Sequence, residues 1–114
     1  MNLREIDRLV AEKVMDWVQG EYAKDKWYYK KNGQIHGMAK FVKDWNPSTN
    51  IADAWQVAEK LMKNGLFFNV LKWIDGDFVA RFENHKVSVK AEAETAPLAI
   101  CLAALKSVGV EVDN

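Results

Sequence analysis

A short polar segment beside a tryptophan holds the residues best suited to bind an anion. The segment WNPSTN, residues 45–50, precedes an expected helix. The free N–H groups and partial positive charge of a helix N-terminus attract anions, and the hydroxyls of Ser48 and Thr49 add donors. The ring of Trp45 can stack on a planar ligand. The pattern therefore predicts ligand contacts from Trp45, Ser48, Thr49 and Asn50.

A purely structural interpretation of this segment stays open. Asn50 is a typical N-cap residue, and Trp45 can pack onto the helix as an anchor. Asp53 stands three residues after Asn50. Its charge favours the positive end of the helix, but it also competes with a bound anion for the same donors.

The segment KWYYKK, residues 26–31, interleaves aromatic side chains with lysines. A base can stack on the ring of Trp27, Tyr28 or Tyr29 while Lys30 or Lys31 meets a phosphate, and we take Tyr28 and Lys30 as the candidate ligand contacts. The alternative is an amphipathic hairpin with an aromatic face on the core and lysines that reach solvent.

Arg81 alternates with apolar residues on an expected strand. An arginine at such a position must be paired or must face a ligand groove, unless it is simply exposed. Glu59 and Glu83 are the candidate partners, and Arg81 is otherwise a further candidate ligand contact.

The residues that carry most enzymatic chemistry are scattered. His36 and His85 are isolated in hairpin regions, and the single cysteine, Cys101, lies in an apolar helical run, where a thiol behaves as a small buried hydrophobe. We find no zinc spacing and no glycine-rich phosphate loop. The sequence therefore indicates no catalytic residue, no metal and no cofactor, although a spatial triad would leave no local signature.

Length and charge narrow the class of protein. The 114 residues suit one domain, 1–114. Lysine plus arginine and aspartate plus glutamate balance at 16 each, which argues against a general nucleic-acid binder. A single cysteine forms no intrachain disulfide, so a reducing, intracellular location fits. We see no signal peptide and no apolar run near the ~20 residues that span a bilayer.

The apolar spacing predicts a first helix over residues 2–18. Asn2 and Glu5 resemble a capping box, and Gly20 is the expected stop. The apolar stripe consists of Leu3, Ile6, Leu9, Val10, Val14, Trp17 and Val18.

A hairpin is expected next, around Asn32-Gly33, the strongest short turn signal. Its strands cover residues 27–31 and 34–36. Residues 38–42 either continue the sheet or lead into the following loop.

A second helix is expected from Asn50 as N-cap to a stop at Asn64-Gly65. Its apolar stripe consists of Ile51, Ala54, Trp55, Ala58, Leu61 and Met62.

Three strands in series are expected after this helix, over residues 66–73, 77–83 and 86–92. The first is nearly continuous apolar sequence, which favours a central strand, and Asp75-Gly76 forms the next hairpin turn.

A last helix is expected between Thr95 as N-cap and Gly109 as stop, with Pro97 in its first turn. It is apolar nearly all round, which indicates deep burial. The tail 110–112 is expected to add a short strand. The sum is an α+β domain with three helices and an antiparallel β-meander.

Three of these segments resemble the phage ABA sandwich domain family. They are IDRLVAEKVMDW, PSTNIADAWQVAEKL and TAPLAICLAALKSVGVEV. More distantly they are similar to the NinX proteins of lambdoid phages, which share a segment of the NPxxNxADAW type. The resemblance covers about half of the chain and leaves the hairpin from Trp27 to Val42 outside.

The resemblance implies a phage origin, expression in the cytoplasm of an infected bacterium, and a three-layer α-β-α sandwich around an antiparallel sheet. It supplies no catalytic motif that maps onto this chain. Small phage accessory proteins of this kind often act stoichiometrically against host defence.

Two functions from different classes follow. The first is a sponge that binds a nucleotide-derived immune signal, with a homo-oligomer as a possible form. The second is a protein-interaction module that inhibits a host protein, because tryptophan dominates interface hot spots and the chain has five. A sequence-specific nucleic-acid partner and a membrane are not expected.

Overall fold

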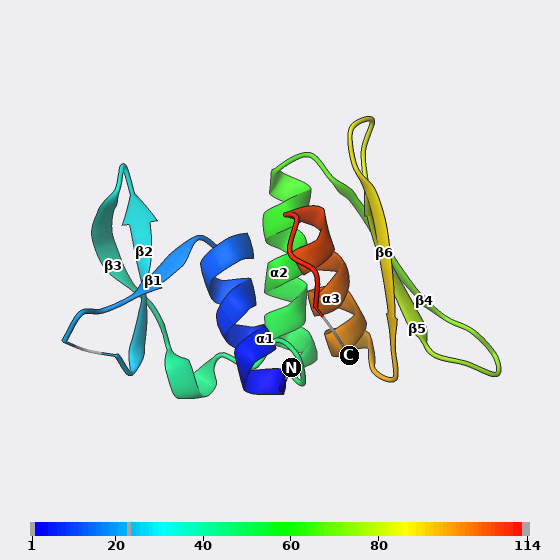
Figure 1. Cartoon of the computed structure of the whole chain (residues 1–114), viewed down its shortest axis with the longest axis horizontal. Coiled ribbons are helices and arrows are strands. Elements are labelled where there is room, and N and C mark those ends of the chain that lie inside the picture. Colours follow the sequence, from blue (N-terminus) through cyan, green and yellow to red (C-terminus); the bar gives the residue numbers. More distant parts are fainter. Residues whose placement is uncertain (1, 23, 113–114) are drawn as a thin grey trace.

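The computed structural model describes residues 2–22 and 24–112, and it places helices between two antiparallel sheets (Figure 1). Each sheet has three strands, in the orders β1-β2-β3 (sheet A) and β4-β5-β6 (sheet B). In chain order the elements are α1 (Leu3–Leu9), the π-helix η1 (Val10–Val14), β1 (Trp17–Gln19), β2 (Lys26–Lys31), β3 (Gln34–Phe41), the 3-10 helix η2 (Val42–Asp44), α2 (Ile51–Lys63), β4 (Phe67–Lys72), β5 (Phe78–Glu83), β6 (Ser88–Ala93) and α3 (Ala96–Ser107). The expected α+β sandwich is confirmed, but its helices lie between two sheets rather than on both faces of one, so the antiparallel meander occurs twice.

The first helix is shorter than its apolar spacing predicts. Its N-cap is confirmed, because the Asn2 side chain accepts a hydrogen bond from the N–H of Glu5 at 2.8 Å. The helix then widens into η1 and ends before Asp16, whose φ of 59° turns the chain out of the helix. The expected stop at Gly20 is wrong, since Trp17 and Val18 already lie in β1. Their three-and-four spacing matched a helix, but no glycine or proline marks the real break.

Sheet A contains the expected hairpin. Asn32 and Gly33 both have positive φ, at 53° and 79°, as a tight hairpin turn requires. The return strand continues to Phe41 rather than ending at His36. Two irregularities in the pairing of β2 with β3 twist this edge of the sheet.

Sheet B has β5 in the centre, so the expectation of a central strand at residues 66–73 is wrong. β4 is an edge strand despite its nearly continuous apolar sequence, because only β5 pairs with it. It leaves Phe67 and Leu71 exposed. The inner face of β5 and β6 packs on α3 and contributes Ala80, Phe82, Ala91 and Ala93 to the core.

The second helix begins as expected, because the Asn50 side chain accepts from the N–H of Asp53 at 3.0 Å. Its buried face is shifted from the predicted stripe. Asp53 and Val57 are buried, whereas Ile51, Trp55 and Met62 are 54%, 47% and 37% exposed. The helix α2 thus has more apolar side chains than the neighbouring elements bury.

The last helix is the centre of the core. Thr95 caps it by accepting from the N–H of Leu98, and Gly109 with a φ of 83° follows its end. All residues from Ala99 to Leu105 are buried. The short strand expected at residues 110–112 does not form. Within the described residues, we find no helix with the length and hydropathy that crossing a bilayer requires.

Candidate ligand-binding cleft

The polar segment at residues 45–50 is buried at Trp45, Pro47 and Ser48, whereas Thr49 and Asn50 are exposed. Trp45 is 1% exposed, and its indole N–H donates to the backbone carbonyl of Asp7 at 3.2 Å. Its ring lies 4.6 Å from that of Trp17, centroid to centroid. The Nζ atom of Lys40 stands 5.4 Å from the same ring. The expectation that Trp45 stacks on a ligand does not fit this geometry, because its faces are covered.

The backbone N–H groups of this segment bind two carboxylates of the chain itself. The N–H of Ser48 donates to Asp7 at 2.8 Å. The N–H of Asn46 donates to Asp53 at 2.8 Å, and Lys40 forms an ion pair with the other oxygen of Asp53 at 2.8 Å. The segment therefore holds an anion, but the anion is internal.

Ser48, Thr49 and Asn50 serve the same local structure. Ser48 is 2% exposed, so the expected contact with an external ligand would need this segment to open. Thr49 and Asn50 are exposed. The Asn50 side chain is already used as the helix cap, and the Thr49 hydroxyl donates weakly to the carbonyl of Asn46 at 3.5 Å.

Burial raises the pKa of Asp7 above its ordinary value. Hydrogen bonding by Ser48 and the charge of Arg4 lower this pKa by less, and the nearby Asp53 raises it further. Arg4 also donates to the backbone carbonyls of Val42 and Trp45, at 3.0 and 3.2 Å. This corner is thus a closed network that joins α1, η2 and the start of α2.

The remaining predicted residues lie apart from this network. Tyr28 is partly buried on β2, between Val18 and Met38 of the neighbouring strands. Arg81 is partly exposed on the outer face of sheet B, between Asn69 and Lys90, and no carboxylate of the described residues pairs with it. Ser48 and Thr49 of the polar segment border a cleft of about 530 Å³ beside Leu98 and Leu102 of α3. Lys30 lines a different cleft.

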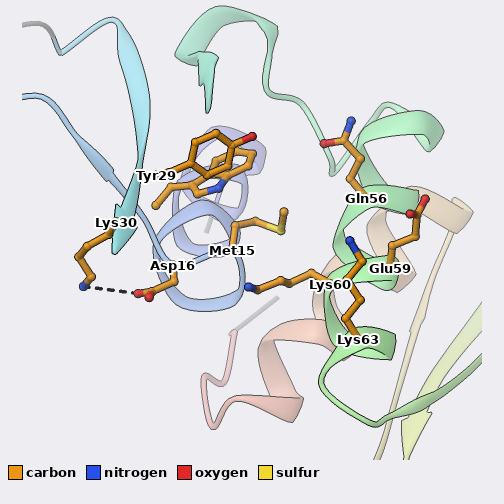
Figure 2. A pocket seen from close by; sticks show the side chains of 9 residues that line it. Met15, Asp16, Tyr29, Lys30, Gln56, Glu59, Lys60 and Lys63 are labelled. Carbon is orange, nitrogen blue, oxygen red and sulfur yellow. Dashed lines mark ion pairs between the residues drawn. The ribbon is translucent and has the colours of Figure 1, made fainter. Parts of the chain in front are cut away.

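That cleft lies between sheet A and α2 and has a volume of about 350 Å³ (Figure 2). One wall comes from the end of the first helix and from β1 and β2, and the other from the second half of α2. Its lining consists of Met15, Asp16, Trp17, Tyr29, Lys30, Gln56, Glu59, Lys60 and Lys63. The volume is within the range of small-molecule sites.

An aromatic ring and several amines meet in this cleft. Tyr29 is 49% exposed and stands edge-on to Trp17, with ring centroids 6.1 Å apart and an interplanar angle of 89°. Lys30 is paired with Asp16 at 3.4 Å. In Figure 2 the Lys60 side chain extends from α2 across the opening toward the wall that carries Asp16.

Lys60 and Lys63 have no ion-pair partner among the residues that the structure describes. Both lie in the last turns of α2, where positive charge is favoured by the helix dipole. Their ammonium groups are therefore held on the rim of the cleft while remaining free to bind an anion.

The wall opposite α2 is built from irregular backbone. The π-helix η1 leads into Met15, and Asp16 adopts the left-handed conformation that residues other than glycine rarely use. π-helical turns and strained residues are concentrated at functional sites. Both features place side chains directly in this cleft.

Sequence reasoning named Tyr29 only as an alternative to Tyr28, and it missed Lys60 and Lys63. Gln56, Lys60 and Lys63 follow one another at helical spacing, so in the sequence they read as the ordinary solvated face of an amphipathic helix. Only the packing of sheet A beside this face makes it a wall. Only the register of β2 shows that Tyr29, and not Tyr28, points into the cleft.

Comparison with known proteins identifies the family. Residues 8–105 match the model of the Phage ABA sandwich domain. The chain belongs to this family. A crystal structure of a phage protein from Bacillus cereus ATCC 14579 is similar, with 30% sequence identity and a TM-score of 0.72 over 99% of this chain and 93% of that one. No curated protein matches.

Membership in the Phage ABA sandwich family extends the resemblance seen in three helical segments. The matched range includes the hairpin of sheet A, which those segments left outside. Neither the family's description nor that of the Bacillus cereus protein names a ligand. Among the described residues, no group of three histidine, cysteine or acidic side chains is placed to hold a metal ion.

Proposed function

We propose that this phage protein is a non-catalytic accessory protein that binds a small anionic ligand in the cleft between sheet A and α2. The ligand is a nucleotide-derived immune signal of the host, and the protein sequesters it in the cytoplasm of the infected bacterium. The observation that carries the proposal is the half-exposed ring of Tyr29 facing the unpaired Lys60 and Lys63.

These groups match the parts of a nucleotide. A base stacks on an exposed aromatic ring, with a contribution of about 1–3 kcal/mol per base. Ammonium groups bind phosphate oxygens, and the amide of Gln56 offers a donor and an acceptor for a base or sugar. A volume of about 350 Å³ suits one nucleotide unit, so further units of a larger signal would extend along the lysine rim.

Sequestration also fits what the cleft lacks. It has no histidine or cysteine, and its two acidic residues, Asp16 and Glu59, lie beside lysines. A sponge needs tight binding and no bond cleavage, so its ligand should be recovered unchanged. Mass spectrometry of ligand released from the protein tests this point, and a chemically altered ligand would favour an enzyme instead.

The binding test compares the wild type with Lys60→Glu/Lys63→Glu in a calorimetric titration against cyclic dinucleotides and trinucleotides, ADP-ribose derivatives and ordinary nucleotides. We expect one class to bind the wild type. The double variant should bind that class more than tenfold more weakly, because each hydrogen bond to a charged group contributes about 1.5–3 kcal/mol. Lys86→Glu/Lys90→Glu, in the turn before β6 and on β6, has the same charge change and should bind normally.

Adjacent tyrosines give a second matched pair. Tyr29→Ala removes the ring in the cleft, whereas Tyr28→Ala removes a ring on the opposite face of the same strand. We expect only Tyr29→Ala to weaken binding. Equal loss in both variants, or normal binding by the lysine double variant, would place the ligand elsewhere.

The alternative, a module that inhibits a host protein, retains support from two of the five tryptophans. Trp55 and Trp73 are 47% and 58% exposed, as interface hot spots must be. Trp17, Trp27 and Trp45 are buried and unavailable for such contacts. A nucleotide screen without any binding would favour this alternative.

A further inference from the structure

We infer that the free edge of β4 is a self-association surface, on which two copies of the chain pair their β4 strands antiparallel. The two sheets B would then form one continuous six-stranded sheet across a two-fold axis. This inference concerns a surface away from the cleft and does not depend on the proposed ligand.

The other sheet edges carry devices that prevent strand pairing. On sheet A, β1 has only three residues, and β3 is irregular in its pairing and contains Gly37 with a φ of 156°. Short, bulged or twisted edges pair poorly with other chains.

The far edge of sheet B is protected by charge. Lys90 and Glu92 are exposed on β6, and the ammonium group of Lys106 on α3 donates to the backbone carbonyl of Lys90 at 3.0 Å. A side chain of the same copy thus occupies part of the β6 ladder. Charged side chains, lysine above all, are the usual protection of an edge strand.

β4 has none of these devices. It is six residues long, pairs with β5 without a register shift, and contains no proline. Its single charged residue, Lys72, donates to the carbonyls of Trp73 and Gly76 in its own hairpin, at 3.3 and 3.2 Å. A regular, mostly apolar edge with a single charge at its end is a template for another strand.

The self-pairing is compatible with charge. When two β4 strands run antiparallel about an axis near Asn69, the two Lys72 residues lie at opposite ends of the shared ladder. No like charges face each other. The chain as a whole has 16 basic and 16 acidic residues, so net repulsion between copies is absent.

The exposed apolar area beside this edge is sufficient for a small dimer. Phe67, Leu71 and Trp73 are 77%, 46% and 58% exposed, and Ile74 is 95% exposed. On the inner side, Trp55 of α2 continues the surface, because its ring packs edge-on against Phe68 of β4 at 5.6 Å. At roughly 150–250 Å² per fully buried aromatic side chain, these residues offer on the order of 600 Å² per copy.

A standard interface buries about 800 Å² per partner. Pairing at the edge covers the parts of these side chains that face across the ladder, and the backbone ladder of β4 adds to the buried area. An isologous contact uses the same patch on both copies, so one exposed edge is enough to form it. A second copy is therefore the occupant that this surface fits best.

Sedimentation equilibrium tests the oligomeric state. We expect the wild type to be dimeric at micromolar concentration and Phe67→Lys/Leu71→Lys to be monomeric, because two lysines would be brought near two others at the axis. Met38→Lys, an equally exposed apolar position on sheet A at 48%, is the control and should remain dimeric. A monomeric wild type would overturn the inference.

Cysteine crosslinking locates the contact. Asn69→Cys on β4 should form an intermolecular disulfide under mild oxidation, whereas Ser88→Cys on β6 should not. The native Cys101 is fully buried and gives no background. A dimer that crosslinks through Ser88→Cys, or a dimer unaffected by the lysine substitutions, would contradict pairing through β4. A stoichiometric host protein on this edge, bound to a monomer, would also overturn it.

Discussion

Asp7 is the residue around which the corner between α1 and α2 is organised. Its carboxylate accepts from Ser48 and Arg4, and its backbone carbonyl accepts from the indole of Trp45. It is 3% exposed, and burial raises its pKa. The folded protein therefore holds a proton on Asp7 more tightly than the unfolded chain does. In the pH range above the unfolded pKa, near 3.9, the charge of Asp7 opposes folding.

The substitution Asp7→Asn tests this cost. Asparagine keeps the oxygen that accepts from Ser48 but carries no charge. Below the unfolded pKa the aspartate is also neutral, so the variant gains no electrostatic advantage there. As pH rises from the unfolded pKa to the raised pKa of the folded state, the wild type loses stability relative to the variant. We expect urea titrations at pH 4 and pH 7 to show the variant comparatively more stable at pH 7. A difference that is the same at both pH values would contradict the raised pKa.

Among single residues, the helix caps could be predicted from the sequence, whereas the burial of Trp45 could not. Asn2, Asn50 and Thr95 each accept from an N–H three residues later, so the signal lies within one helical turn. Trp45 and Ser48 owe their burial to Asp7, which is 38 and 41 residues away in the chain. No local pattern contains that partner.

The junction between η1 and β1 is the most unusual element of the fold. The chain leaves a π-helix, passes through Asp16 in the left-handed conformation and enters a strand within three residues. Aspartate tolerates this conformation better than most residues do. The junction places Met15 and Asp16 in the cleft, so its geometry sets the shape of one wall.

Substitutions at Asp16 should separate conformation from charge. Asp16→Val places a β-branched residue in the left-handed region, and we expect it to lower the free energy of unfolding by about 1–2 kcal/mol. Asp16→Gly also loses the exposed ion pair with Lys30, which contributes little, but it fits the conformation. Chemical denaturation should therefore find Asp16→Gly within about 1 kcal/mol of the wild type. An equal loss in both variants would mean that the ion pair, not the backbone, matters.

The type of most elements followed from the sequence, and two of the three assignments that failed have a clear physical reason. Trp17 and Val18 continue a helical apolar spacing that a strand also satisfies once the chain has turned. β4 is apolar like a central strand, yet it lies at the edge of sheet B. A continuous apolar sequence does not show which element covers a strand. If its free edge pairs with a second copy, β4 becomes a central strand of the shared sheet, as its apolar sequence suggests.

At the scale of the whole molecule, two sheets are joined through a set of helices. Sheet B packs closely on α3. Sheet A is anchored by buried tryptophans, with Trp17 and Trp27 from its strands and Trp45 from the segment that follows β3. The sequence predicted every strand except β1, but not the division into two sheets, because the pairing of distant strands depends on this packing.

Trp45→Ala should uncouple sheet A from the rest of the molecule. Replacing a buried tryptophan with alanine costs about 3–5 kcal/mol. Hydrogen exchange should show that the amides of β2 and β3 lose protection before those of β5 and β6. Tyr22→Ala, at a position 96% exposed, is the control and should leave stability unchanged. A stable Trp45→Ala variant with uniform protection would contradict the role of this residue as an anchor.

The separate anchoring of sheet A also affects how the protein can diverge. The turn at Asn32-Gly33 is exposed, and no atoms crowd Gly33. Insertions or deletions at this turn change the length of the β2–β3 hairpin without repacking α3 or sheet B. A lineage can therefore remodel one wall of the cleft while it inherits the core intact, which is the freedom that a protein needs when the molecule it binds keeps changing.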